Sequence, residues 1–328
     1  MDAESLDIAT SARLVVSELL GVKAREQVAL VCDPLSEMTM VHALANAVEC
    51  AGGEYTILVM PTRAEDRKNQ LTPPIERALE AADCLIGLTR SGGAPTYSRT
   101  VKRLLDAKRL RSISMVMRGL DNYTGGGARA DYPRLLKDGE SLAEIWRGAE
   151  RIRVTTPVGT DLRAPISGET VIIECGYARQ AGQEAAFSDG EVSQMPRAGC
   201  SEGVVVVDGP IAHIGLPESP ISLEVTGGRV RAIRGDCPQA ARLRQIVESI
   251  PQADNVAEIG IGLNPMCRRN GDFEEEKKAR GLVHVAIGDN IFYGGRVESP
   301  VHMDMVLYAP TVYLDDRVVV DAGEVLLD

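Results

Sequence analysis

The stretch QVALVCDPLSEMTMVHALANAVECAGGEYTILVM, residues 27–60, decides the fold class of the first part of this chain. Its two apolar runs, 27–32 and 54–60, have the length and composition of buried strands. Residues 38–52 between them have the apolar spacing of a helix that ends at a glycine pair. The same alternation continues with a helix over 73–82, a strand over 83–89, a helix over 98–109 and a strand over 112–117. Strands that alternate with helices predict a parallel sheet covered on both faces, here a doubly wound, Rossmann-like α/β domain over residues 1–150.

The pattern changes after residue 150. Residues 151–166 predict two strands around a Pro-Val-Gly-Thr turn, and residues 203–236 predict short strands broken by glycine and proline. One helix is expected over 237–250, and strands follow it to the end. We therefore expect a second, strand-rich α+β domain over residues 151–328. The glycine-rich stretch 123–133 lacks the order of a phosphate-binding loop and predicts a flexible loop.

The composition narrows the class of protein. The chain has 328 residues and a formal net charge of −11, from 47 acidic and 36 basic residues. This balance argues against a nucleic-acid or anionic-membrane partner, which would favour a basic surface. Neither a signal peptide nor a membrane-spanning run is expected, and the seven cysteines contain no CxxC pair. The sequence predicts a cytoplasmic protein.

Two side chains stand out in the apolar stretch VHMDMVL, residues 301–307. In a strand, His302 and Asp304 point to the same face because successive side chains alternate. An imidazole beside a carboxylate suits a divalent metal ion. The alternative is a hydrogen-bonded His–Asp pair on a half-exposed sheet.

Polar side chains of the kind that bind metals also occur in other predicted apolar strands. His284 lies in LVHVAIG and Glu258 lies in NVAEIGIGL, while Glu191 follows a turn in SDGEVSQMP. A carboxylate is rarely buried without a partner. Lone ligand-type residues on several strands therefore predict a shared cation where the strands converge.

The segments GEVSQMP, AEIGIGLNP, GLVHVAIGDN and SPVHMDM, in this order, resemble the aminopeptidase T and S family of metallopeptidases. The resemblance implies a co-catalytic two-metal site of zinc, cobalt or manganese and a homodimer or higher homo-oligomer. It also implies the metal ligands, which are Glu191, Glu258, His284 and Asp304, with His302 at or beside the metals. The acidic residue that this family has shortly before the strand histidine is replaced here by Ala279, and Glu276 is the nearest substitute.

The C-terminal part is also similar to the 2,5-dihydroxypyridine dioxygenases, ring-cleaving enzymes with one Fe(II). The resemblance implies an iron held by two histidines and one carboxylate. One of these histidines falls where this chain has Glu258, and those enzymes lack an equivalent of Glu191.

Because of these carboxylates, the sequence favours a metallohydrolase, an aminopeptidase-like enzyme that cleaves an amide or peptide bond in a short peptide or another small substrate. Glu191 or Glu276 would move the proton to the leaving amine, and Tyr293 would donate to the oxyanion or serve only in packing. An Fe(II)-dependent dioxygenase of a hydroxylated N-heterocycle is the alternative. A binding protein that has lost its metal is a third.

Overall fold

The structure is a computed structural model that describes residues 3–63, 69–90 and 95–327. The chain forms two compact units. Unit 1 comprises Met1–Arg129 and Cys175–Asp189, and unit 2 comprises Ala130–Glu174 and Gly190–Asp328. The sequence-based division into residues 1–150 and 151–328 stays a prediction about domains. The two compact units differ from it because the chain returns to unit 1 after residue 174.

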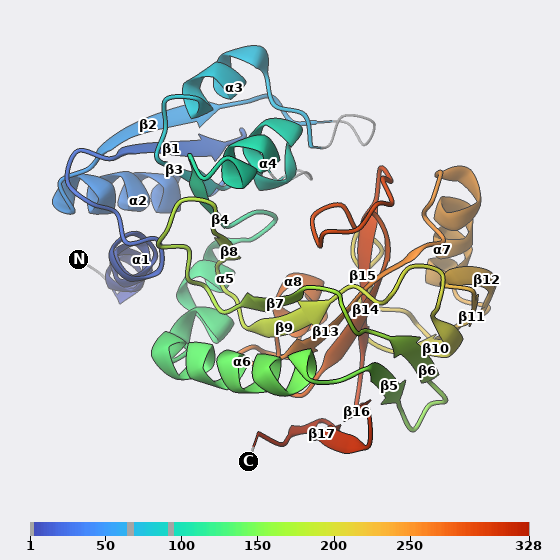
Figure 1. The fold of residues 1–328 in the computed structure, drawn as a ribbon. Helices are drawn as coiled ribbons and strands as arrows, with labels where there is room; N and C mark the ends of the chain where they lie inside the picture. The colour runs from blue at the N-terminus through green and yellow to red at the C-terminus, as the bar shows by residue number, and fades with distance from the viewer. Residues whose placement is uncertain (1–2, 64–68, 91–94, 328) are drawn as a thin grey trace. The chain divides into compact units, whose positions relative to one another are not determined.

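Unit 1 is built on a five-stranded parallel sheet with the order β2-β1-β3-β4-β8. In Figure 1, α2 lies on one face of this sheet and α3 and α4 lie on the other. The strands are β1 (Gln27–Cys32), β2 (Glu54–Val59), β3 (Cys84–Gly87), β4 (Arg111–Ser114) and β8 (Glu184–Ala186). The helices are α1 (Ala3–Arg13), the π-helical η1 (Leu14–Leu19), α2 (Met38–Cys50), α3 (Pro73–Leu79), α4 (Arg99–Asp106), α5 (Leu120–Thr124) and the short 3₁₀ turns η3 (Pro95–Tyr97) and η4 (Gly126–Arg129).

The alternating pattern predicted for unit 1 is confirmed. Each predicted strand and helix has its counterpart, and the helices are shorter than predicted by a few residues at one or both ends. The strand β8 was missed because its three residues, 184–186, carry no periodic signal and join the sheet from beyond residue 150.

Unit 2 contains two antiparallel sheets. The larger has the order β12-β11-β10-β6-β5-β16-β17-β18, and the smaller has the order β15-β14-β13-β9-β7. The larger sheet is formed by β5 (Arg151–Thr155), β6 (Asp161–Pro165), β10 (Glu202–Val207), β11 (Ile221–Thr226), β12 (Arg229–Arg234), β16 (Thr311–Leu314), β17 (Arg317–Asp321) and β18 (Glu324–Val325). The smaller sheet is formed by β7 (Val171–Glu174), β9 (Glu191–Gln194), β13 (Val256–Gly262), β14 (Val283–Gly288) and β15 (His302–Leu307). The helices of unit 2 are α6 (Tyr132–Arg147), α7 (Pro238–Ser249) and α8 (Phe273–Glu276).

The strand-rich character predicted for residues 151–328 is confirmed, as are the helix at 237–250 and the turn at Gly227 and Gly228 between β11 and β12. In the smaller sheet, β13 and β14 are buried along their whole length. Both faces of these strands are therefore covered, which explains why they are near-continuous apolar runs rather than alternating ones.

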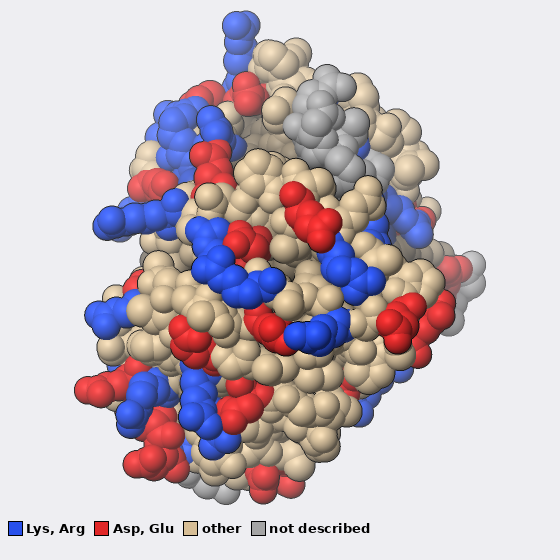
Figure 2. Space-filling view, turned by 90° about the vertical axis from the view of Figure 1, so that its right-hand side faces the viewer, with Lys and Arg blue, Asp and Glu red and all other residues tan. Residues whose placement is uncertain are grey.

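The surface carries charges of both signs. On the face shown in Figure 2, acidic and basic side chains are interspersed, and neither sign forms one continuous field. Among the described residues, none of the helices combines the length and the apolar character needed to cross a bilayer.

Candidate metal centre

The residues predicted to bind metal lie on one face of the smaller sheet of unit 2. In an antiparallel sheet, residues directly opposite each other point to the same face. Asp304 lies opposite Ala286, which lies opposite Glu258. One row further, His284 lies opposite Gly260. The alternation of side chains along β9, β13, β14 and β15 therefore gathers Glu191, Glu258, His284, His302 and Asp304 on a common side.

Two glycines of β13 make this arrangement possible. A Cβ at Gly260 would lie 2.1 Å from Cε1 of His284, so only glycine leaves room for the imidazole ring. A Cβ at Gly262 would lie 2.2 Å from the backbone oxygen of Ala279, so this position lets the chain after α8 approach the sheet. The sequence GIG in this strand is thus a requirement of close packing beside the site.

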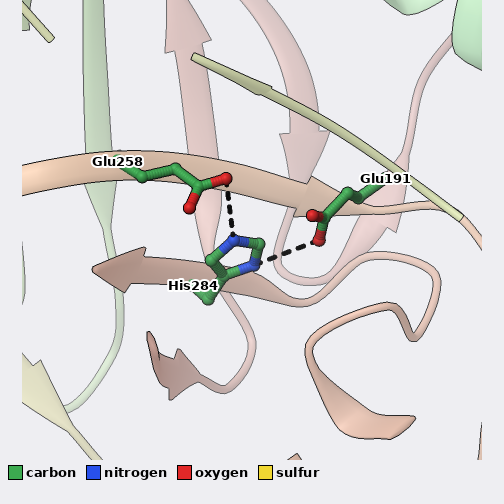
Figure 3. A group of neighbouring side chains, drawn as sticks. All are labelled: Glu191, Glu258 and His284. Atoms are coloured by element: carbon green, nitrogen blue, oxygen red, sulfur yellow. Dashed lines mark ion pairs between the residues drawn. The ribbon is translucent and has the colours of Figure 1, made fainter. Parts of the chain in front are cut away.

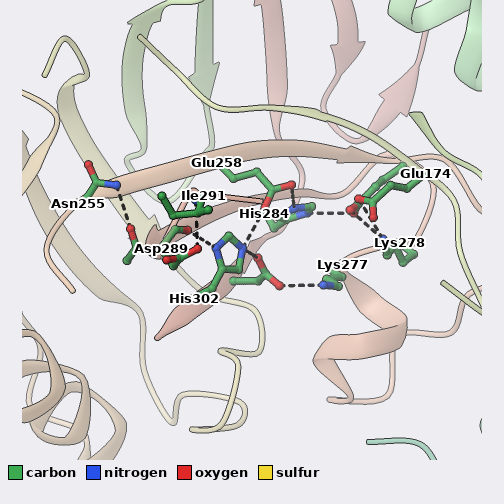
Figure 4. Close-up of polar contacts among 12 residues, drawn as sticks. Glu174, Asn255, Glu258, Lys277, Lys278, His284, Asp289, Ile291 and His302 are labelled. Atoms are coloured by element: carbon green, nitrogen blue, oxygen red, sulfur yellow. Dashed lines mark hydrogen bonds and ion pairs between the residues drawn. The ribbon is translucent and has the colours of Figure 1, made fainter. Parts of the chain in front are cut away.

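The first group of side chains consists of Glu258, His302 and Asp304. Nε2 of His302 lies 3.0 Å from Oε2 of Glu258 and 3.2 Å from Oδ1 of Asp304. Nδ1 of His302 lies 2.7 Å from the backbone oxygen of Asp289. Since a carbonyl only accepts, Nδ1 carries the proton and points Nε2 at the two carboxylates (Figure 4). This is the way in which proteins orient a metal-binding histidine.

The second group consists of Glu191, Glu258 and His284, so the two groups share Glu258. Figure 3 shows the His284 ring between the two carboxylates. Nδ1 lies 3.6 Å from Oε2 of Glu191, and Nε2 lies 3.6 Å from Oε1 of Glu258. His284 is fully buried. Its two nitrogens face different carboxylates, and the three residues bring one ligand atom each within 4.8 Å of one another.

Two lysines that follow α8 reach the same face. Nζ of Lys277 lies 2.8 Å from Oδ2 of Asp304, and Nζ of Lys278 lies 2.7 Å from Oε1 of Glu191 and 3.7 Å from Oε2 of Glu174. Both are visible in Figure 4. The sequence analysis missed these lysines because the run EEEKKAR is typical of a solvated helix face, whereas here Glu274, Glu275, Glu276 and Lys278 are all buried.

Several buried polar atoms of the site have no hydrogen-bond partner among the described residues. These atoms are Oε2 of Glu191, Oε1 of Glu258, both ring nitrogens of His284 and Oδ1 of Asp304. Buried polar atoms are normally satisfied, and a cluster of unsatisfied acceptors calls for an explanation. Oxygen and imidazole nitrogen donors suit a divalent transition-metal ion. The residues present therefore fit a bound cation, best at the first group.

The electrostatics of the site agree with this conclusion. Burial would raise the pKa of Asp304, but Lys277 and His302 outweigh it and hold that pKa well below its ordinary value. Burial would lower the pKa of His302, but Asp304 and Glu258 raise it well above its ordinary value. The carboxylate of Asp304 is thus kept ionised, and a metal ion competes with a proton for His302.

The remaining predicted residues have different positions. The carboxylate of Glu276 accepts hydrogen bonds from the hydroxyl of Tyr308 at 2.6 Å and from the backbone N–H of Gly271 at 2.5 Å, and Glu276 belongs to neither group. The ring of Tyr293 stacks on His302, with 5.2 Å between the ring centroids. Tyr293 therefore lies beside the first group, and Glu276 anchors α8.

Comparison with known proteins extends over almost the whole chain. The sequence profile of the 2,5-dihydroxypyridine 5,6-dioxygenase family, NicX, matches residues 11–327. The 2,5-dihydroxypyridine 5,6-dioxygenase of Pseudomonas putida is 27% identical over 270 residues, which cover 76% of this chain and 73% of that protein.

Two solved structures share the fold. The structure of 2,5-dihydroxypyridine dioxygenase from Pseudomonas putida superposes with a TM-score of 0.83 at 22% identity and covers 98% of this chain and 97% of that one. Aminopeptidase T from Thermus thermophilus superposes with a TM-score of 0.69 at 16% identity and covers 99% of this chain and 100% of that one. At these identities the superpositions show the fold alone.

The prediction of an aminopeptidase-like metallohydrolase is wrong. The family match does not support a hydrolase, an aminopeptidase or a metalloprotease. The short segments around the predicted ligands resemble the peptidases because one fold carries both kinds of enzyme, and a fold does not determine the reaction. The match along residues 11–327 covers both units, so it distinguishes the dioxygenases from the aminopeptidases better than those short segments do. The chain belongs to the family of 2,5-dihydroxypyridine 5,6-dioxygenases.

Proposed function

We propose that this protein opens the ring of a hydroxylated pyridine with molecular oxygen, using a single Fe(II) ion held by Glu258, His302 and Asp304. The observation that carries this proposal is the family match over residues 11–327. In such a reaction both atoms of O₂ enter the product and a ring bond is broken. The substrate supplies the electrons, so no other reductant is required.

The first group is the best candidate for the iron ligands. Its three residues lie on β13 and β15, on either side of β14, and their ligand atoms lie within 4.8 Å of one another. Oδ1 of Asp304 and Oε1 of Glu258 have no hydrogen-bond partner among the described residues. Three protein ligands on one side of an Fe(II) ion leave positions open for substrate and oxygen, which is the facial-triad arrangement. When bound there, iron would supply the activation of O₂ that organic side chains cannot provide.

The donor set departs from the usual triad of two histidines and one carboxylate. The resemblance to the dioxygenases implies a histidine where this chain has Glu258, so the group here offers one imidazole and two carboxylates. Carboxylates are harder and anionic, and they favour Mn(II) and Fe(II) over softer ions. We propose that the site still binds Fe(II), with more negative charge around it than in a two-histidine site.

Neighbouring residues of the protein hold the ligands of this site in position. The carbonyl of Asp289 fixes the tautomer of His302, and Lys277 fixes Asp304 through its second oxygen. Tyr293, stacked on His302, provides a flat aromatic surface beside the group. A planar N-heterocycle can pack against such a surface, and this supports an aromatic substrate.

The test is oxygen uptake by protein loaded anaerobically with Fe(II) and then mixed with 2,5-dihydroxypyridine. We expect one O₂ to be consumed for each substrate molecule. When ¹⁸O₂ is used, the mass of the product should show that both ¹⁸O atoms were incorporated. Protein loaded with Zn(II), and Fe(II)-loaded protein kept under nitrogen, serve as controls and should leave the substrate intact. Substrate loss without O₂ uptake, or no turnover of this and related hydroxypyridines, would overturn the proposal.

A further inference from the structure

The second group, Glu191, Glu258 and His284, has the residue types of a metal site but also a charged neighbour that has no part in the proposed iron site. Lys278 is buried, with its side chain 3% exposed, and its Nζ lies 2.7 Å from Oε1 of Glu191. The same Nζ lies 3.7 Å from Oε2 of Glu174. An ammonium group therefore already binds Oε1 of Glu191, next to Oε2, the oxygen that faces His284.

We infer that Lys278 acts as a built-in cation that keeps a second metal ion out, so that the centre binds one ion although it contains ligands for two. This inference rests on the proposed function only in assuming that the first group binds a metal. It assigns to Lys278 the role of setting the number of metal ions.

The charges of the site support this role. Glu174, Glu191, Glu258 and Asp304 supply four negative charges on this face, and Lys277 and Lys278 supply two positive ones. One divalent ion at the first group balances the charges of these six side chains. A second divalent ion would leave two positive charges in excess beside side chains that are almost completely buried, which is strongly unfavourable.

The geometry supports it as well. His284 turns one nitrogen toward Glu191 and the other toward Glu258, each at 3.6 Å, so its ring fills the space between them (Figure 3). Gly260 leaves room for the ring at this place, since the ring lies against the backbone of β13. The three residues still bring one ligand atom each within 4.8 Å of one another, so the group has donors for a second ion, and the ammonium of Lys278 on Glu191 is the charge that opposes it.

The position of Lys278 is set by the chain around it. The backbone N–H of Asn264 donates to the carbonyl of Lys278 at 2.9 Å, and Gly262 allows the Lys278–Ala279 peptide to lie against β13. The neighbouring Lys277 instead reaches Asp304 of the first group. The two adjacent lysines thus face the two groups separately, and this provides a matched pair of variants.

The experiment counts metal ions in the full-length protein. Wild type, Lys278→Met and Lys277→Met are freed of metal with chelator, titrated with Mn(II) and measured by calorimetry, elemental analysis and electron paramagnetic resonance. We expect one ion in wild type and in Lys277→Met. In Lys278→Met we expect two ions, with the altered spectrum of two coupled Mn(II) ions a few ångströms apart. Lys278→Gln provides a second neutral variant if the methionine variant does not fold.

Each outcome decides a different point. Two ions in wild type, or one ion in a folded Lys278→Met, overturns the role of Lys278. No ion in wild type overturns the metal centre itself and the proposed function with it. One ion in wild type, two in Lys278→Met and no reaction with hydroxypyridines would retain the role of Lys278 and reject the proposed function.

If neither Lys278 variant folds, Glu191→Gln decides. Under the inference Glu191 binds lysine and not metal, so this variant keeps one Mn(II) with an affinity close to that of wild type. Loss of the ion from Glu191→Gln would overturn the inference.

Discussion

Gly260 is the residue at which a single added methyl group tests the site most directly. A Cβ there would lie 2.1 Å from Cε1 and 2.4 Å from Nε2 of His284, so Gly260→Ala must displace the ring. Overpacking of this kind costs about 1–3 kcal/mol. We expect a lower melting temperature and changed NMR signals of the His284 ring.

Gly148 provides the control for this variant. A Cβ at Gly148 would meet its nearest atom, the carbonyl oxygen of Ile145, at 3.5 Å, an ordinary contact, and its φ of −81° suits any residue. Gly148→Ala should therefore leave both the stability and the His284 signals nearly unchanged. Equal melting temperatures and equal His284 signals in the two variants would contradict the close contact between Gly260 and His284.

His302 carries the second prediction at this scale. Its Nε2 is the one nitrogen donor of the first group, and its replacement also removes the stacking surface of Tyr293. We expect His302→Ala to lower the affinity for Fe(II) or Mn(II) by at least about 100-fold, more than the loss of an outer partner. Calorimetric titration measures this, with the exposed His42 replaced by alanine as the control. Unchanged binding in His302→Ala would remove the first group as the metal site.

The candidate ligands could be predicted from the sequence, and the lysines could not. Glu258 and His284 interrupt apolar strands, and a polar residue in such a strand is a strong signal because its burial needs a partner. Lys277 and Lys278 lie in a run of charges, where burial leaves no trace in the sequence. Their pairing depends on Gly262 admitting the chain next to β13, which only the structure shows.

At the scale of elements, α8 is a helix of four residues that side chains anchor in addition to its few backbone hydrogen bonds. Glu275 binds the guanidinium of Arg268 with both oxygens, and Glu276 accepts from Tyr308. An isolated helix of this length is unstable in water. These anchors therefore determine where Lys277 and Lys278 lie.

Tyr308→Phe tests this anchoring. The variant removes the hydroxyl that binds the buried carboxylate of Glu276 at 2.6 Å, and we expect a loss of about 1.5–3 kcal/mol in the free energy of unfolding. Amide hydrogen exchange should quicken in α8. Tyr313→Phe is the control, because Tyr313 contacts Arg153 through its ring, which phenylalanine retains. Equal losses in both variants would contradict the anchoring role.

In unit 1, a partly buried ion pair ties β4 to the segment before β1. Arg111 donates to both oxygens of Glu26, at 3.0 and 2.6 Å, and to the backbone oxygens of Leu20 and Gly21. Burial would raise the pKa of Glu26, but the hydrogen bonds from Arg111 and from the backbone of Lys23 outweigh it and lower that pKa.

This pair gives a prediction for the pH dependence of stability. Because the folded pKa of Glu26 is lowered, its contribution is complete above the ordinary value of 4.5 and is lost as the pH falls through the lower folded value. Arg111→Met should cost about 1.5–3 kcal/mol at pH 7, and less in acid. Urea unfolding at several pH values measures the difference. The exposed pair Arg234–Glu224 is the control, and Arg234→Met should cost under about 1 kcal/mol.

At the scale of the whole molecule, the two kinds of sheet could be predicted, but not the return of the chain to unit 1 after residue 174. The alternation of strands and helices before residue 130 predicts the parallel sheet because each apolar run is followed by a helical one. The fifth strand, β8, has three residues and is added from residues 184–186, so no local pattern could reveal it. The reaction could not be predicted either, since one sheet with the same kinds of ligands supports different chemistries.

Metal removal distinguishes the two units. Three buried carboxylates converge on the smaller sheet of unit 2, and a cation that binds the folded state stabilises it by about 2.7 kcal/mol at a concentration 100 times its Kd. We expect chelation to quicken hydrogen exchange in β13, β14 and β15 and to leave β1 and β3 of unit 1 unchanged. Re-addition of Fe(II) or Mn(II) should restore the protection, and it should fail to do so in His302→Ala. Since β13 and β14 are fully buried, their exchange reports cooperative opening rather than fraying, so an equal response of β1 and β3 would place the bound ion elsewhere.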